Sequence, residues 1–132
     1  MVMWRKFRVV RAQGFTLIEL IVVMAIIALL ITIVAPRYMR SLEKSKEAVL
    51  KEDLWVMRDA LDKYYGDLGK YPNSLDELVE QKYLRAVPVD PLTDSTTTWE
   101  VVAPVDPELG AIYNVKSGAS GSSSLGTSYS DW

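Results

Sequence analysis

One carboxylate near the N-terminus is the first group in this chain that calls for a chemical explanation. Glu19 is the only ionisable side chain between Phe15 and Ala35, in a run that is otherwise almost entirely apolar. An acid inside a membrane helix costs on the order of 2.5–3.5 kcal/mol on insertion scales, so it normally has a function and a partner. The alternative is that Glu19, being near one end of the run, snorkels toward the lipid headgroups.

The usual catalytic side chains are scarce elsewhere in the chain. There is no His and no Cys, which removes the commonest general base and every Ser-His or Cys-His arrangement. Asp59 and Asp62 could be pictured as paired catalytic carboxylates, but acids three residues apart among basic neighbours are typical of a solvated helix face. We therefore predict that the protein is not an enzyme.

The run that contains Glu19 predicts a membrane-spanning helix. As a helix, Phe15 to Ala35 is roughly 31 Å long, which matches the hydrocarbon core of a bilayer. No Gly occurs from Phe15 to Tyr65 and only one Pro, Pro36, so the helix should continue well beyond the membrane. Pro36 removes a backbone donor where the apolar run ends, which predicts a kink or a locally loosened helix unless it merely marks the membrane boundary.

The segment before the apolar run is basic and contains no acid. It carries Arg5, Lys6, Arg8 and Arg11, which should keep this leader in the cytoplasm while the remainder is translocated. The apolar run is longer than the core of a secretory signal peptide, and no small-x-small cleavage site follows it. Ordinary signal peptidase is therefore a poor fit.

The residues around this junction resemble the class III signal of type IV pilins and type II secretion pseudopilins. The match consists of a basic leader, an apolar span and the sequence Gly14-Phe15-Thr16-Leu17-Ile18-Glu19. The resemblance implies that a prepilin peptidase cleaves between Gly14 and Phe15 and N-methylates Phe15. The new amine could then meet the Glu19 carboxylate of a neighbouring subunit, where each charge offsets the cost of burying the other. A proline at position 36 also matches the pilin pattern, and we expect a hinge role for Pro36.

An α+β fold is expected, with one long helix packed against a small antiparallel sheet. We expect a leader at residues 1–14, a transmembrane and assembly helix at 15–36, and a periplasmic domain at 37–132. In that domain an apolar stripe at helical spacing should face the core, formed by Leu50, Leu54, Met57, Leu61, Tyr64 and Leu68. The helix should stop near Gly66 to Gly69.

A connecting loop with a short second helix should follow. Ser74 or Asn73 can cap this helix, Glu77 completes a capping box with Ser74, and Leu75, Leu78 and Val79 supply its inward face. Tyr71 to Pro91 is similar to the loop of major pseudopilins. Thr97 to Val102 and Ala111 to Lys116 read as an antiparallel strand pair, and a third short strand is not demanded.

The tail is rich in Ser and Gly, which favours a flexible end, but Tyr129 and Trp132 argue that it packs down as an ordered loop. In major pseudopilins the corresponding loop often holds calcium through acidic side chains. Here Asp131 is the only acid in the tail, and a hard cation usually collects six to eight oxygens including carboxylates. Calcium at Asp131 is therefore a weak candidate, and we expect no cofactor.

Charge and composition bear on partners. The chain has 132 residues and a net charge of −2, and loss of the four leader cations leaves 11 basic against 17 acidic residues. An acidic exported part is unsuited to nucleic acid. The resemblance implies a homopolymer filament in the inner membrane and periplasm, with prepilin peptidase, an assembly platform with its ATPase, and minor pseudopilins as partners.

Three functions remain open from the sequence. The first is a major pseudopilin that drives protein export in a type II secretion system. The resemblance favours it because adhesive type IV pilins commonly have a Cys-closed C-terminal loop, which is absent here, and because the proline-rich loop is similar to that of major pseudopilins. The second is a type IV pilin used for adhesion, motility or DNA uptake. The third is a membrane-anchored domain that is never cleaved.

Overall fold

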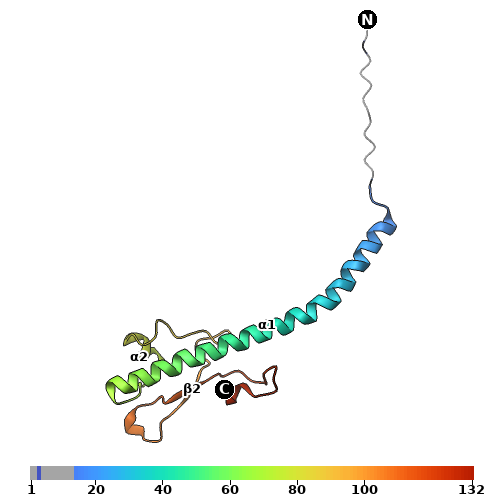
Figure 1. Ribbon diagram of the computed structural model, residues 1–132. Helices are drawn as coiled ribbons and strands as arrows, with labels where there is room; N and C mark the ends of the chain where they lie inside the picture. The colour runs from blue at the N-terminus through green and yellow to red at the C-terminus, as the bar shows by residue number, and fades with distance from the viewer. Residues whose placement is uncertain (1–2, 4–13) are drawn as a thin grey trace. The chain divides into compact units, whose positions relative to one another are not determined.

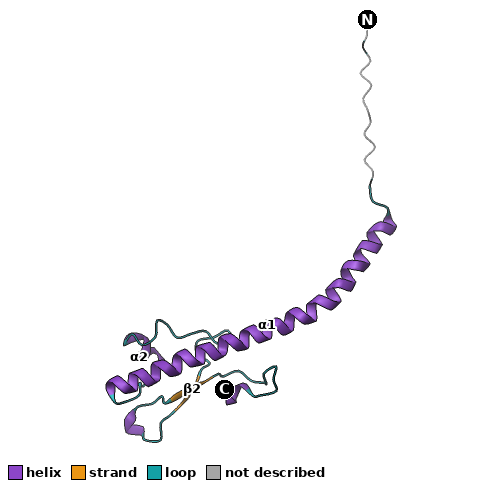
Figure 2. Ribbon diagram, in the orientation of Figure 1, coloured by secondary structure: helices purple, strands orange, loops and turns teal. Residues whose placement is uncertain are grey.

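The computed structural model describes Met3 and residues 14–132. Over these residues the elements in chain order are the helices α1 (Leu17–Leu68) and α2 (Leu75–Glu80), the strand β1 (Glu100–Val102), the 3₁₀ turn η1 (Pro107–Leu109), the strand β2 (Asn114–Lys116) and the 3₁₀ turn η2 (Tyr129–Asp131) (Figures 1 and 2). The α+β fold with one long helix and a small antiparallel sheet is confirmed. Apart from Met3 and Gly14, the expected leader lies outside the described residues.

The chain separates into two compact units, Met1–Tyr38 and Met39–Trp132. The separation falls two residues beyond Pro36, and the expected boundaries stay predictions. The functional division into an assembly helix and a periplasmic domain stays a prediction.

Helix α1 has 52 residues, which confirms the long helix predicted from the scarcity of Gly and Pro. Its helical conformation is continuous through Pro36, so the backbone is not locally melted there, and the hinge role stays a prediction. At the other end, the N–H of Gly69 donates to the carbonyl of Tyr65 at 2.8 Å, and Gly69 has φ of +69°. A left-handed glycine in this position closes the last turn and ends the helix where the sequence predicted.

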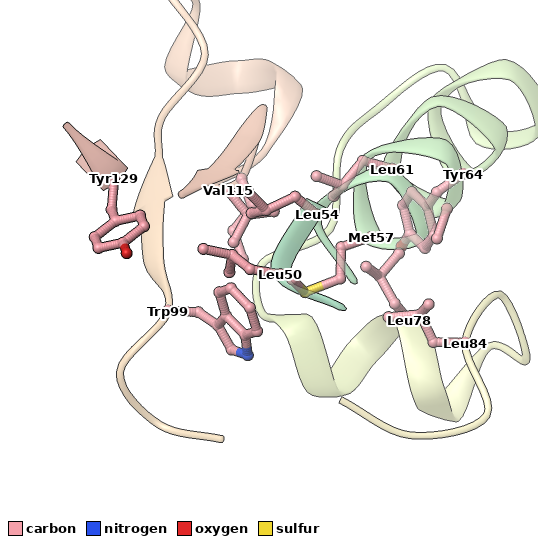
Figure 3. Close-up of a cluster of buried hydrophobic side chains, with 12 residues drawn as sticks. Leu50, Leu54, Met57, Leu61, Tyr64, Leu78, Leu84, Trp99, Val115 and Tyr129 are labelled. Atoms are coloured by element: carbon pink, nitrogen blue, oxygen red, sulfur yellow. The ribbon is translucent and has the colours of Figure 1, made fainter. Parts of the chain in front are cut away.

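The second unit is built around the predicted stripe on α1. Its buried side chains are Leu50, Leu54, Met57, Leu61 and Tyr64, and Ala60 joins them. Figure 3 shows the stripe between two groups of partners, Leu78 and Leu84 on one side and Trp99, Val115 and Tyr129 on the other. The inclusion of Leu68 was wrong, because Leu68 is 49 % exposed in the last turn of the helix. Leu68 is the last residue of α1, and the chain leaves the helix directly after it, at Gly69.

The cap of α2 largely follows the sequence prediction. Ser74 is the N-cap, and its hydroxyl accepts from the N–H of Glu77 at 3.2 Å. The Glu77 carboxylate reaches one residue further back than in a standard capping box and accepts from the N–H of Asn73 at 2.6 Å. Its other oxygen accepts from the hydroxyl of Tyr64 at 2.7 Å, which ties α2 to α1. Leu78 is fully buried, while Leu75 and Val79 pack at the edge of the core.

The hydrogen bond between Tyr64 and Glu77 predicts that the domain loses stability at alkaline pH. The Glu77 hydrogen bond, together with burial, raises the pKa of Tyr64 to about 12. Because the folded pKa lies above the unfolded value of about 10, the stabilisation is complete below pH 10 and is lost as the pH rises toward 12. We expect Tyr64→Phe to lower the free energy of unfolding by about 1.5–3 kcal/mol at pH 7 and to remove much of the loss between pH 10 and 12. Denaturant titrations across this range measure both effects.

Tyr83→Phe is the matched control for this prediction. The hydroxyl of Tyr83 also donates to a carboxylate, that of Asp67 at 2.6 Å, but at an exposed position. Its removal should change stability much less, because water replaces the lost partner. Equal losses in the two variants would contradict the role assigned to Tyr64.

The strand pair is present but shorter than predicted. Strands β1 and β2 are antiparallel, and Glu100 lies opposite Lys116 and Val101 opposite Val115. The N–H groups of Ala111 and Ile112 donate to the carbonyl of Pro72 rather than to β1. These donors are satisfied by the connecting loop, so the ladder begins only further along. Within the described residues there is no third strand.

Candidate processing and assembly site

The N-terminus of α1 holds the residues singled out by the sequence. Gly14, Phe15 and Thr16 precede the first helical residue, Leu17. The N–H of Glu19 donates to the hydroxyl of Thr16 at 3.2 Å, and the Glu19 carboxylate accepts from the N–H of Thr16 at 3.4 Å. This reciprocal pair is a capping box, and a Thr three residues before a Glu was a signal that sequence reasoning missed at this position.

The Glu19 carboxylate keeps most of its bonding capacity. Its contact with the N–H of Thr16 is longer than a typical hydrogen bond, and both groups are exposed. Within the residues that the structure describes, the one ion pair joins Lys63 to Asp59, so Glu19 has no cation there. The carboxylate is therefore placed at the helix end and can accept from a group outside this unit.

Phe15 and Glu19 lie close together at the start of α1. Together with Leu20 and Val23 they line a depression of about 160 Å³, and Phe15 is 89 % exposed. An amine on Phe15 and the Glu19 carboxylate would thus be presented on the same side.

The peptide bond between Gly14 and Phe15 is accessible. Gly14 is exposed in non-helical chain, and a methyl group added at its Cα would meet no heavy atom within 4 Å. A protease that binds extended backbone can therefore reach this bond without unfolding α1. Within the described residues, no steric contact requires glycine at this position.

The apolar side chains around and after Glu19 are exposed. Every Leu, Ile, Val and Met side chain from Leu17 to Val34 is at least 44 % exposed. The helix is long and apolar enough to cross a membrane, although a signal sequence near an N-terminus would pass the same test. Apolar residues on all sides of a helix require lipid or other helices as surroundings.

The remaining candidates from the sequence do not form a second site. Asp59 accepts from Lys63 at 2.8 Å in an exposed pair one helical turn apart, as expected for a solvated face. Asp131 is exposed in η2. Among residues 14–132 no group of three or more His, Cys, Asp or Glu side chains is arranged to hold a metal ion.

Comparison with known proteins decides the family. The family model described as prokaryotic N-terminal methylation motif matches residues 10–35. Type II secretion system core protein G of Klebsiella pneumoniae is 34 % identical, over 61 % of this chain and 69 % of that protein. The chain belongs to the type II secretion system core protein G family.

Other members of the core protein G family agree with this assignment. The protein of Pseudomonas aeruginosa is 35 % identical over 60 % of this chain and 67 % of its own length, and that of Aeromonas hydrophila is 32 % identical over 61 % and 68 %. No solved structure matches the chain to a comparable standard. The match places this chain among the pilin-like major pseudopilins, and it confirms the resemblance seen around Gly14 and Glu19.

Proposed function

We propose that this protein is the repeating subunit of a periplasmic pseudopilus that drives protein export in a type II secretion system. The observation that carries the proposal is membership of the core protein G family together with the methylation motif over residues 10–35. The relatives are structural subunits, which fits a chain without His or Cys. Nothing favours the type IV pilin alternative.

Processing comes first in the proposed pathway. The protein is inserted with residues 1–14 on the cytoplasmic side and the domain in the periplasm, because the basic residues cluster before the apolar run. A prepilin peptidase then hydrolyses the bond between Gly14 and Phe15 and methylates the new amine of Phe15. The accessibility of this bond in non-helical chain supports the proposal.

Assembly follows from the surface that processing leaves. The exposed apolar side chains between Leu17 and Val34 can be buried against the same segments of other copies, and this burial favours a bundle of helices. In such a bundle the cationic amine of Phe15 on one subunit lies against the Glu19 carboxylate of the next. Either charge alone would be stranded in apolar surroundings, so the pair selects one axial register.

The chain does not supply the energy that extends the filament. It contains no GxxxxGK[ST] phosphate loop, so we assign the work to a partner ATPase that acts through an inner-membrane assembly platform, with minor pseudopilins as further partners. The subunit contributes the rod whose extension moves exoproteins toward the outer membrane. Its role is mechanical.

Deletion of the gene tests the function directly. Exoproteins should accumulate in the periplasm of the deletion strain, while surface fibres and DNA uptake stay normal, and the wild-type chain should restore export. Loss of surface fibres or of transformation with normal export would instead identify a type IV pilin and contradict the proposal.

A further inference from the structure

A buried carboxylate lies under the serine-rich tail. Glu47 on α1 is only 7 % exposed, although acidic side chains are rarely buried without partners. One of its oxygens accepts from the N–H of Ser124 at 2.7 Å and from the hydroxyl of Tyr129 at 3.1 Å. The other accepts from the hydroxyl of Ser124 at 2.7 Å. Three donors from the tail thus converge on one helix residue.

The tail is attached to α1 at two further turns. The guanidinium of Arg58 donates to the backbone oxygen of Trp132, and also to the backbone oxygen of Val115 at 3.0 Å. The ammonium of Lys51 lies 4.6 Å from the centre of the Trp132 ring, at the distance of a cation–π contact. The ring of Trp132 in turn packs edge-on against that of Tyr129 at 5.2 Å. The Glu47 contacts are therefore the first of three successive attachments along one helix.

Serine and threonine hydroxyls give the tail its internal structure. The hydroxyl of Ser123 accepts from the N–H of Thr127 at 3.2 Å and lies 2.7 Å from the hydroxyl of Thr127. Ser117, at the start of the tail, donates to the fully buried carboxylate of Asp90 at 2.5 Å. Local side-chain bonds of this kind replace a ladder in short loops. Composition alone had suggested flexibility, and these bonds supply the missing order.

The residues present do not fit the calcium that the family resemblance implies. Calcium requires six to eight oxygens that face it as acceptors. At Glu47 both carboxylate oxygens already accept from N–H and O–H donors of the tail, and at Asp90 both oxygens accept from Leu92 and Ser117. No buried side-chain polar atom in residues 14–132 lacks a hydrogen-bond partner. The donors therefore point at carboxylates, which is the opposite of a cation site.

We propose that Glu47 takes the place of a bound cation in this protein and holds the tail, residues 117–132, onto α1 without any metal. One helix carboxylate collects the donors of the loop, whereas a cation would collect its acceptors. The proposal concerns the folding of the domain and does not depend on the filament function. A failure of one therefore leaves the other standing.

The attachment has a definite pH dependence. Burial raises the pKa of Glu47, but the hydrogen bonds from Ser124 and Tyr129 and the charge of Lys51 outweigh burial and hold the pKa below its ordinary value. Glu43 is the other acid that faces Tyr129. Because the folded pKa is lowered, the stabilisation is complete above the unfolded value of about 4.3 and is lost as the pH falls below it. The attachment of the tail to α1 should therefore weaken as the pH falls below this value.

Hydrogen exchange measured by mass spectrometry on the full chain in detergent micelles tests the proposal. Wild type, Glu47→Gln and Glu47→Ala are compared in EGTA and in calcium chloride. Glu43→Gln is the matched control, because Glu43 is exposed one turn earlier on the same helix. Amides of α2 report whether the rest of the domain is folded.

We expect wild-type protection of amides 121–129 to be the same in EGTA and in calcium. In Glu47→Ala that protection should fall about tenfold or more, with a smaller fall in Glu47→Gln, while α2 and Glu43→Gln match wild type. Tail protection that disappears in EGTA and returns with calcium would overturn the proposal, as would unchanged tail protection in Glu47→Ala. Ser124→Ala removes one hydroxyl donor from the tail and should give an intermediate loss of tail protection. Because this variant leaves α1 unchanged, the loss would not come from damage to the helix.

Discussion

Gly14→Ala is expected to abolish processing, so that the protein accumulates in the membrane as an uncleaved precursor that begins at Met1. The structure makes this variant informative, because a methyl group at Gly14 meets nothing within 4 Å and lies before the first turn of α1. The loss must therefore come from the peptidase, whose site has to accept the backbone on the N-terminal side of the bond. We expect the rate constant of cleavage to fall by at least about tenfold, which corresponds to roughly 1.4 kcal/mol in the transition state. N-terminal mass spectrometry after co-expression with a prepilin peptidase measures it.

Gly66→Ala is the matched control for processing. Gly66 lies near the end of α1, and a methyl group there also has no neighbour within 4 Å, so this variant should be cleaved and methylated like wild type. Normal cleavage of Gly14→Ala, or a wild-type protein that still carries residues 1–14 under these conditions, would contradict the processing assignment.

Glu19→Gln is expected to be cleaved, methylated and inserted, yet to form very little filament. Glutamine keeps the shape of the side chain but removes its charge, so the Phe15 amine of a neighbouring subunit would be left without a counter-ion in apolar surroundings. Loss of one partner from a buried pair costs about 2–5 kcal/mol, which weakens association roughly 30-fold or more for each contact. The yield of sheared or sedimented filaments, normalised to mature subunit, measures the effect.

Thr16→Ala separates charge pairing from helix capping. The Glu19 side chain also accepts from the N–H of Thr16, and the Thr16 hydroxyl accepts in return. If assembly depended on this capping box, Thr16→Ala would lower the filament yield as much as Glu19→Gln does. We expect Thr16→Ala to assemble nearly normally, because it leaves the carboxylate intact. An equal defect in the two variants would contradict the charge-pairing account.

The parts of the fold that depend on linear patterns could be predicted from the sequence. The length of α1 follows from the scarcity of Gly and Pro in this part of the chain. Its buried stripe follows from a three-and-four spacing that needs no knowledge of the partner segments. The processing motif is equally local. Leu68 fits the same spacing but is 49 % exposed, because burial also requires a segment that covers the side chain, and Leu68 is the last residue of the helix.

The features that sequence reasoning missed depend on contacts between distant residues. Sequence reasoning assigned no role to Glu47, because only the fold brings Ser124 and Tyr129 to it from about 80 positions away. Strand β2 is shorter than predicted for a similar reason, since the N–H of Ala111 donates to the carbonyl of Pro72. The capping role of Thr16 was within reach of the sequence, because its spacing to Glu19 is the same as that of Ser74 to Glu77.

A density map of the purified wild-type filament, at a resolution that shows side chains, tests the central claim most directly. The claim is that proteolysis creates a cation on Phe15 and that this cation neutralises Glu19 of the adjacent subunit. The account predicts an N-methylated amine on Phe15 within about 4 Å of the neighbouring Glu19 carboxylate. A map in which these two groups lie far apart, with Glu19 bound only to its own Thr16, would contradict it.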